Sequence, residues 1–246
     1  GGVSFTMKAI PTGSFNMGCV SGKNCQSVEK PVHQVTLDAF HMMETEVTWS
    51  LYQQCINSGS CDNNDSAGGD EGWGKGSRPV INVSFDDITN HFIPWLNKRV
   101  NHPTGQGFSL PSESQWEYAA RAGTTTQYSW GNSIDCSKAR YGYSSDECGK
   151  QKSTDPVKSF SPNPWGLYDM HGNVWEWTQD CFNTSYQGAP SKGQPWLTGN
   201  CGYRVVRGGS WIYEPNYLRS AFRSSFTRTK RFYSNGFRLV LSSQSE

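Results

Sequence analysis

The 246-residue sequence has no apolar run of about 18 residues, so we expect no segment that crosses a membrane as a helix. Charge is also scarce, because charged residues make up 17% of the chain and the formal net charge is +1. A chain so balanced has no general attraction to phosphate, and we expect no nucleic-acid partner. Residues 1–10 have no basic region and no long apolar region, so we expect no signal peptide there.

The common catalytic motifs are absent as well. The sequence has no P-loop, no dinucleotide fingerprint, no Gly-x-Ser-x-Gly elbow and no His-x-x-x-His pair. The acidic stretch 60–79 lacks EF-hand spacing, which favours a solvated loop over a calcium loop. Glycine and tryptophan are abundant instead, with 26 and 10 residues. This composition is typical of a loop-rich fold that is held together by large aromatic rings.

No Cys-x-x-Cys pair occurs, which disfavours zinc ribbons and thioredoxin-like sites. The eight cysteines fall as sequence neighbours, and we expect four disulfides that each close a local loop: Cys19–Cys25, Cys55–Cys61, Cys136–Cys148 and Cys181–Cys201. Eight buried free thiols in a cytosolic protein are the alternative. Disulfides would place the protein in an oxidising environment, at the cell surface, in the periplasm or secreted.

Short apolar segments predict strands near the N-terminus. Alternation around Pro11 predicts a hairpin over 5–18, and alternation over 33–42 predicts one strand. Predicted strands and helices come first, followed by a long irregular part with short strands, which indicates an α+β fold. With no repeat and no linker in the sequence, we expect one domain over 1–246.

Three helices are predicted, and each begins at a hydroxyl N-cap: Thr48, Ser84 and Ser112. Gln115 completes a capping box with Ser112. Pro94 should kink or interrupt the second helix, and Gly123 should end the third in the left-handed conformation.

The segment "YDMHGNVWEW" (168–177) is the densest motif. Trp175 and Trp177 would face one side of an extended segment, with Glu176 on the other. Asp169, Glu176 and carbonyls of the Gly172 turn offer oxygen ligands for calcium. A tryptophan-rich core strand without a metal is the alternative.

Several motifs occur in order between about Phe5 and Val240 and together resemble one family. They are "IPTGSFNMG", "EVTWSLYQQC", "SLPSESQWEYAARAGT", "NPWGLYDMHGNVWEWTQD" and "RVVRGGSW" with "NGFRLV". This order is similar to the formylglycine-generating-enzyme-type sulfatase-modifying domain, a variant of the C-type lectin fold. The resemblance implies an α+β, C-type lectin-like fold rich in irregular structure, and we expect the N- and C-terminal strands to be neighbours.

The resemblance also implies a metal and argues against one activity. Oxidase members of the family use two cysteines between "GGS" and the final "GFR", but 210–238 contains no cysteine, so we do not expect formylglycine generation. The family's calcium ligands fall on Asp169, Gly172, Val174 and Glu176, so we expect a structural calcium ion there.

The C-terminal segment 204–240 resembles the variable proteins of diversity-generating retroelements. In those proteins adenine-directed mutation places aromatic and small hydroxyl residues between conserved positions. We expect the corresponding residues here to form one exposed ligand-binding patch above Arg219, Arg223, Arg231 and Arg238. They are Ile212, Tyr213, Tyr217, Phe222, Ser224, Ser225, Phe226, Thr227, Phe232, Tyr233 and Ser234.

The expected function is non-enzymatic binding of a protein or other macromolecule on a cell or host surface. A lipid anchor on the full-length form of the chain is one way in which the protein itself would be held at a cell surface. The alternatives are a catalytically inactive or cryptic formylglycine-generating-enzyme-like accessory protein, and an oxidoreductase of the periplasm.

Overall fold

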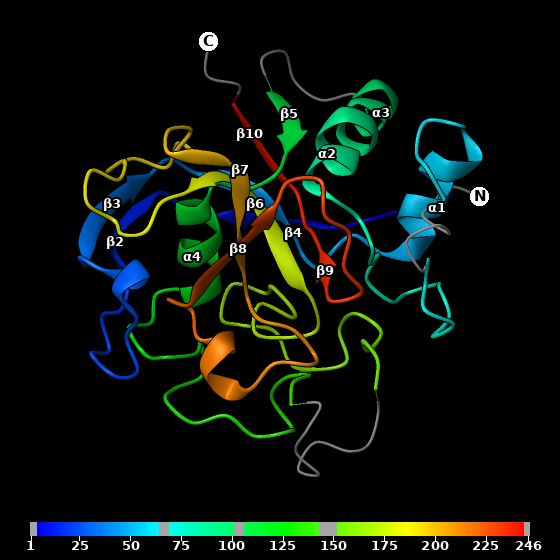
Figure 1. Ribbon diagram of the computed structural model, residues 1–246. Coiled ribbons are helices and arrows are strands. Elements are labelled where there is room, and N and C mark those ends of the chain that lie inside the picture. Colours follow the sequence, from blue (N-terminus) through cyan, green and yellow to red (C-terminus); the bar gives the residue numbers. More distant parts are fainter. Residues whose placement is uncertain (1–3, 64–68, 101–105, 143–151, 244–246) are drawn as a thin grey trace.

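A computed structural model describes residues 4–63, 69–100, 106–142 and 152–243. The described strands form three sheets, and the helices pack beside these sheets instead of alternating with single strands (Figure 1). β6 (Trp175–Phe182) and β9 (Asn235–Gly236) run parallel to each other, and every other described strand pair is antiparallel. This is the predicted α+β architecture.

The N-terminal strands form a long antiparallel ribbon. The first sheet has the strand order β1 (Met7–Ile10), β4 (Phe40–Met43), β10 (Val240–Ser243) and β5 (Gln106–Ser109). The second sheet consists of β2 (Gly13–Met17) and β3 (His33–Leu37). The ribbon crosses between them, because β1 pairs with β4 in the first sheet and β2 pairs with β3 in the second. The predicted hairpin over 5–18 is therefore wrong, because β1 and β2 each pair with a later strand. Pro11 has no N–H for the ladder, and the ribbon breaks there.

Two further expectations need correction in these sheets. The segment 33–42 is two strands, because the chain changes sheet at Asp38 and Ala39. The terminal strands β1 and β10 are not neighbours, because each pairs with one edge of β4, which lies between them.

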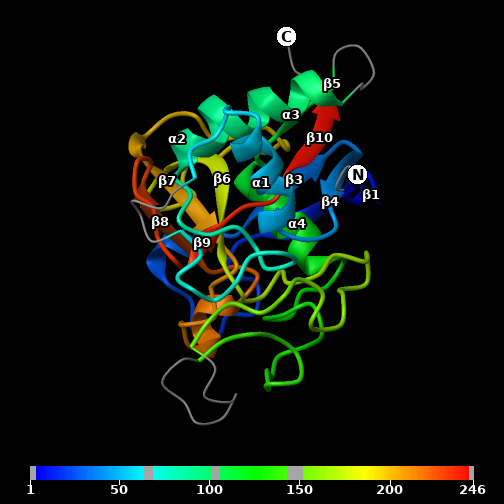
Figure 2. The ribbon, with the colours of Figure 1, turned by 90° about the vertical axis from the view of Figure 1, so that its right-hand side faces the viewer.

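The third sheet carries the segment of interest. Its order is β8 (Arg223–Thr227), β7 (Asn200–Arg207), β6 and β9. Trp175 and Trp177 of β6 are buried in the largest hydrophobic cluster. The helix α4 (Glu113–Arg121) packs against the opposite face, beside β6 and β7 (Figures 1 and 2). There Trp116 Nε1 donates to Glu176. Both faces of this sheet are therefore occupied near its centre.

The predicted N-caps are confirmed. Thr48 accepts a hydrogen bond from Leu51 N at the start of α1 (Trp49–Asn57), and Ser112 and Gln115 form the capping box of α4. Ser84 caps α2 (Phe85–Asp87), which continues through a π-helical turn (Ile88–Phe92) into α3 (Ile93–Arg99).

Two predicted helix features take a different form. Pro94 occupies the second position of α3, directly after the π-helical turn, so the chain stays helical on both sides of the proline. At the end of α4 the left-handed conformation begins one residue early, at Ala122 with φ 47°, and Gly123 follows with φ 88°.

Three of the predicted disulfides are present: Cys19–Cys25, Cys55–Cys61 and Cys181–Cys201. Cys136 is also disulfide-bonded, and its predicted partner Cys148 lies outside the described residues. Disulfides of this number indicate an extracellular or periplasmic protein. In the part of the chain that the structure describes, no helix has the length and apolar character of a membrane span.

Candidate ligand-binding surface

The segment 204–240 starts in β7 and ends at β10, and it contains two loops. The first, 208–222, includes the short 3-10 helix η5 (Pro215–Leu218), and the second, 228–234, joins β8 to β9. Each loop begins and ends at a strand, so the positions of both loops depend on the third sheet.

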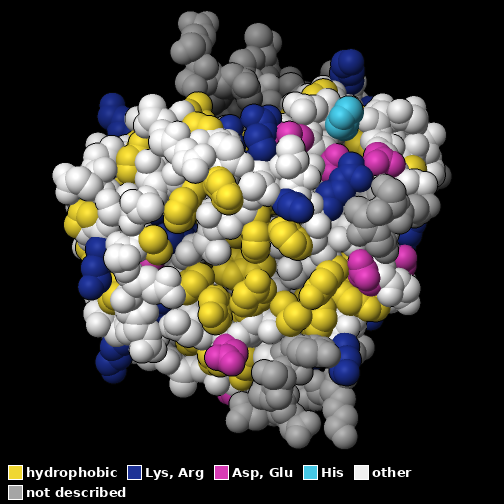
Figure 3. Space-filling model, in the orientation of Figure 1, with side chains coloured by type: hydrophobic (Ala, Val, Ile, Leu, Met, Phe, Trp, Pro, Cys, Tyr) yellow, Lys and Arg dark blue, Asp and Glu magenta, His cyan; other side chains and the backbone are white. Residues whose placement is uncertain are grey.

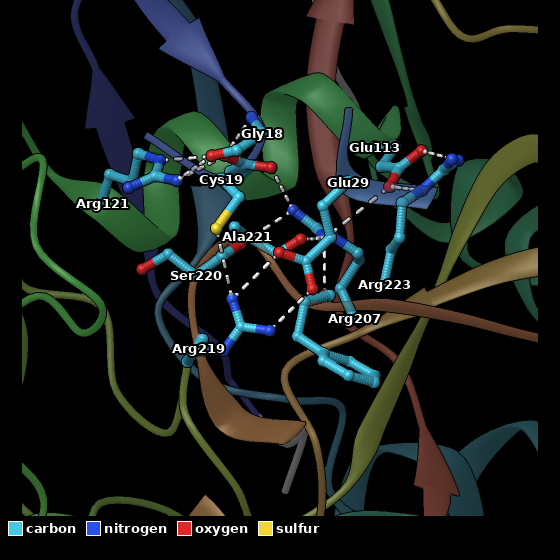
Figure 4. Close-up of polar contacts among 12 residues, drawn as sticks. Gly18, Cys19, Glu29, Glu113, Arg121, Arg207, Arg219, Ser220, Ala221 and Arg223 are labelled. Atoms are coloured by element: carbon cyan, nitrogen blue, oxygen red, sulfur yellow. Dashed lines mark hydrogen bonds and ion pairs between the residues drawn. The ribbon is translucent and has the colours of Figure 1, made fainter. Parts of the chain in front are cut away.

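Buried arginines anchor this segment to the rest of the protein. Arg219 donates two hydrogen bonds to Glu29, of 2.6 and 2.9 Å, and Arg223 donates two to Glu113, of 2.6 and 2.7 Å. Figure 4 shows these pairs side by side, with the glutamates coming from segments far away in the sequence. Burial alone would raise the pKa of Glu113, but the guanidinium groups of Arg223 and Arg207 lower it below its usual value.

Arg207 and Arg238 complete the buried part of this anchor. The Arg207 guanidinium contacts Glu117 and donates to the carbonyls of Ser220 and Ala221, at 2.8 and 2.9 Å. Arg238 donates two hydrogen bonds of 2.7 Å to Glu176. We call these four buried pairs the arginine frame: Arg207–Glu117, Arg219–Glu29, Arg223–Glu113 and Arg238–Glu176. Two-point hydrogen bonding to a carboxylate restricts Arg219, Arg223 and Arg238 to one geometry, and backbone carbonyls do the same for Arg207.

The second loop has an anchor of its own nearer to the surface. Arg231 donates to both oxygens of Asp87, at 2.6 and 2.7 Å, and reaches Asp62 at 3.1 Å. The second loop is thereby fastened to the last residue of α2. The sequence-based expectation that Arg219, Arg223, Arg231 and Arg238 support the loops is confirmed, but their acidic partners were not predicted.

Aromatic side chains of the first loop contact one another in a row, in edge-on and tilted orientations. The ring centroid of Tyr213 lies 5.3 Å from that of buried Trp175 and 5.1 Å from that of Tyr217. The ring of Tyr217 lies 4.9 Å from that of Phe222. Such ring contacts hold the side chains in fixed relative positions.

The second loop adds another set of rings. Phe226 at the end of β8 lies 4.8 Å from Phe232 and 6.2 Å from Trp177. Tyr233 lies 6.2 Å from Trp73, which comes from the acidic loop 60–79. The sequence reading of that loop as merely solvated missed Trp73, because nothing local shows that the loop folds back onto 204–240.

We call the resulting group the aromatic surface: Trp73, Tyr213, Tyr217, Phe226, Phe232 and Tyr233. These residues are half-buried, except for Tyr233, which is 40% exposed. Figure 3 shows hydrophobic side chains gathered over the middle of this face, with Lys and Arg side chains at its upper margin. Beneath them Trp175 and Trp211 are almost fully buried, at 1% and 3% exposure.

Two of the predicted ligand-binding residues are buried and not exposed as expected. Phe222 is only 4% exposed because it packs between Tyr217 and Trp175. Ser234 is buried because its carbonyl accepts from Trp175 N at the start of β6. Both residues support the surface from below.

The pleat of β8 separates four other predicted residues. Ser224 and Phe226 share one face of the strand, and the ring of Phe226 contacts Trp177 there. Ser225 and Thr227 lie on the opposite face with Arg223, whose side chain reaches Glu113 of α4. The expectation of one patch is therefore wrong for Ser225 and Thr227. Ile212 is half-buried in the first loop, beside Tyr213.

Of the four predicted calcium ligands, Gly172, Val174 and Glu176 are buried and Asp169 is half-buried, and Glu176 is already engaged. Its oxygens accept hydrogen bonds from Arg238 and from Trp116 Nε1, so the residues do not fit a calcium ion that needs Glu176. Asp169 Oδ2 accepts from Lys158 N, and burial raises the pKa of Asp169 to about 6. Calcium remains a prediction that rests on Asp169 and the carbonyls of Gly172 and Val174.

Gly172 shows why this turn needs a glycine. Its φ is 114°, and a Cβ there would lie 2.3 Å from the carbonyl oxygen of Arg140. Nearby Glu46 is fully buried, and one of its oxygens accepts from Asn173. Burial and the neighbouring Asp169 raise the pKa of Glu46 well above its usual value.

A family model described as the sulfatase-modifying factor enzyme 1-like domain matches residues 5–243. The chain belongs to this formylglycine-generating-enzyme-type family. It is 30% identical to the formylglycine-generating enzyme of Streptomyces coelicolor over 93% of this chain and 87% of that protein. The fold is the predicted α+β, C-type lectin-like fold of this family.

Two solved structures of similar fold cover almost the whole chain. PvdO from Pseudomonas aeruginosa is 31% identical, with a TM-score of 0.81 over 96% of this chain and 94% of that chain. Treponema denticola variable protein 1 is 29% identical, with a TM-score of 0.77 over 98% and 96%. This chain therefore resembles both enzymes of the formylglycine-generating type and a variable protein.

The two cysteines expected of the family's oxidase members are missing, because 210–238 contains no cysteine. In the described part of the chain no cysteine is free. The ionisable groups of the aromatic surface are tyrosines, and burial raises the pKa of Tyr213 further. The surface is therefore suited to apolar contacts and hydroxyl hydrogen bonds.

Proposed function

We propose that this protein is a non-enzymatic ligand-binding protein of the diversity-generating-retroelement variable type. It would bind a protein or other macromolecule on a cell or host surface. The observation that carries the proposal is the aromatic surface, which presents five ring side chains from three loops and that of Phe226 from β8 above the arginine frame. Contiguous exposed aromatic patches usually mark interfaces, and rigid rings lose little entropy when they bind.

The enzyme alternative has less support. An active site needs a recess where polar groups converge on a substrate. The buried His171, in the segment 168–177, lines a cavity of only about 10 Å³. Its Nε2 accepts from Ser129 N and its Nδ1 lies 2.7 Å from Leu218 O, so both ring nitrogens are engaged.

Binding by the aromatic surface can be tested with displayed random linear peptides selected on the wild-type protein. Tyr213→Ala and Phe226→Ala should each weaken binding of the selected peptides by about 1 kcal/mol or more. Tyr203→Ala is the matched control, because Tyr203 is exposed on the same sheet but pairs with Thr227 on the opposite face. Equal losses in all three variants, or no loss in any, would contradict the proposal.

Diversification itself has a separate test in the surrounding DNA. A near-copy of the codons for 204–240 should occur close by, with differences at adenines and next to a reverse transcriptase. Without such a copy, the protein would be a binding protein of fixed specificity.

A further inference from the structure

A groove lies beside the aromatic surface, between β5, the α2–α3 helical segment and β7. Its volume is about 640 Å³. The apolar part of its lining consists of Phe85, Ile93, Phe108, Leu110 and Leu197. Leu197 is 58% exposed although its loop is fastened by the Cys181–Cys201 disulfide and by Trp196 N, which donates to Asp180. A large apolar side chain held in water at the edge of a groove is typical of a contact site.

The groove is continuous with the aromatic surface. Arg204 of β7 lies directly opposite Phe226 of β8 in the register, so both side chains are on the same face of the sheet. The guanidinium of Arg204 lies 4.5 Å from the ring centroid of Phe85. Phe85 contacts Trp177, and Trp177 contacts Phe226. A ligand that covers Phe226 therefore reaches Arg204 and the groove.

Arg204 has donors left for a ligand. Its Nη1 donates to Gln179 O at 2.6 Å, but Nε is buried without a hydrogen-bond partner in the described residues. Nε itself is enclosed, but the other amino group, Nη2, makes no hydrogen bond among the described residues and is available to an incoming acceptor. The guanidinium is thus held in place by Gln179 and Phe85, and no ion pair of Arg204 occurs among the residues that the structure describes.

The charges around Arg204 leave an excess of positive charge. The Arg228 guanidinium lies 5.8 Å from the centroid of the same Phe85 ring and pairs with Asp86 at 2.7 Å. Asp180 is buried, and its two oxygens accept from Glu113 N and Trp196 N. Two guanidinium groups therefore face one accessible carboxylate, so the groove entrance favours an anion.

Strand addition is not the binding mode at this groove. β5 is an edge strand, but the backbone N–H and carbonyl of Phe108 on its outer edge are both bonded to the Asn97 side chain. A peptide cannot pair with β5 there. Recognition must come from side chains that enter the groove.

We propose that the groove receives an acidic side chain of the protein ligand, with an adjacent apolar side chain packed against Phe108 and Leu197. The carboxylate would accept from Arg204, and the apolar side chain would fill the groove beyond it. This inference rests on the proposed function, since it names the chemistry of the partner that the aromatic surface binds.

The test uses the displayed peptides selected on the wild-type protein. Selected peptides should be enriched in Asp or Glu next to an apolar residue. Arg204→Gln should weaken their binding about tenfold or more, because a charge-assisted hydrogen bond is lost. Arg204→Lys should retain part of the affinity, and binding to wild-type protein should fall with added salt. Binding of the same peptides to Tyr213→Ala and to the control Tyr203→Ala is measured in the same experiment.

The outcomes separate the two proposals. If Tyr213→Ala weakens peptide binding and Arg204→Gln does not, the groove proposal is wrong and the aromatic surface is the binding site. If only Arg204→Gln weakens peptide binding, the groove proposal is supported and the proposal for the aromatic surface is wrong. If neither variant weakens peptide binding, both proposals are wrong. If Arg204→Gln does not fold, peptides with Glu→Gln are titrated against wild-type protein, and unchanged affinity would overturn the groove.

Discussion

Arg219 and Glu29 are 190 residues apart in the chain, yet the guanidinium of Arg219 forms two hydrogen bonds with the Glu29 carboxylate. Both side chains are almost completely buried. The pair joins the short 3-10 helix η1 (Ser27–Glu29), near the Cys19–Cys25 disulfide, to the first loop of the candidate ligand-binding segment. The first loop is therefore positioned by a contact outside its own neighbourhood.

The Arg219–Glu29 pair predicts a large stability effect. Arg219→Ala should lower the free energy of unfolding by about 3–5 kcal/mol, because it leaves the Glu29 carboxylate buried and unpaired. Arg228→Ala is the control, since the Arg228–Asp86 pair is partly exposed and should contribute about 0–1 kcal/mol. Urea denaturation measures both. Similar losses in the two variants would show that Arg219 is not an anchor of the loop.

Alanine substitutions at Phe222 and Tyr233 should differ in their effect on stability, because Phe222 supports the aromatic surface from below and Tyr233 is exposed on it. Phe222→Ala should cost about 3–5 kcal/mol of stability, because the ring is buried under Tyr217. Tyr233→Ala should change stability by less than about 0.5 kcal/mol, since Tyr233 is the most exposed ring of the aromatic surface. Denaturant titrations of the two variants test this, and a stable Phe222→Ala protein would place Phe222 on the surface after all.

Asp180 predicts a pH dependence of stability. Burial, followed by the nearby charge of Glu113, raises the pKa of Asp180 to about 7. The folded protein therefore holds this proton more tightly than the unfolded chain, whose pKa is about 3.9. Stability associated with Asp180 should be greatest at low pH and should fall as the pH rises from about 4 to about 7.

Asp180→Asn removes that titration. The variant loses one backbone hydrogen bond at every pH, because an amide has only one acceptor oxygen for Glu113 N and Trp196 N. The difference in melting temperature between wild type and variant should therefore narrow as the pH rises through this range. A constant difference would mean that Asp180 does not titrate there.

Calcium binding is tested by melting curves with calcium and with chelator. If Asp169 and the turn carbonyls bind the ion, calcium should raise the melting temperature of the wild type, and Asp169→Asn should abolish the rise. Glu176→Gln should lower the melting temperature with or without calcium, because Arg238 loses its buried partner. If the wild-type melting curve is the same in chelator as in calcium, the prediction of a calcium site is wrong.

Local features of this protein follow from the sequence alone. The N-caps at Thr48, Ser84 and Ser112 involve atoms no more than three residues away, so short motifs determine them. The Cys19–Cys25 and Cys55–Cys61 disulfides likewise close short loops between sequence neighbours. The ordered family motifs over nearly the whole chain were sufficient to predict the fold.

Only the tertiary structure decided which residues form the surface. The pairing of β1 with β4, the arrival of Trp73 beside Tyr233 and the glutamate partners of the arginines are long-range contacts. No local pattern encodes them, because each depends on where the rest of the chain packs. The pleat of β8 then turns Ser225 and Thr227 away from Phe226, since alternate side chains of a strand must point to opposite faces.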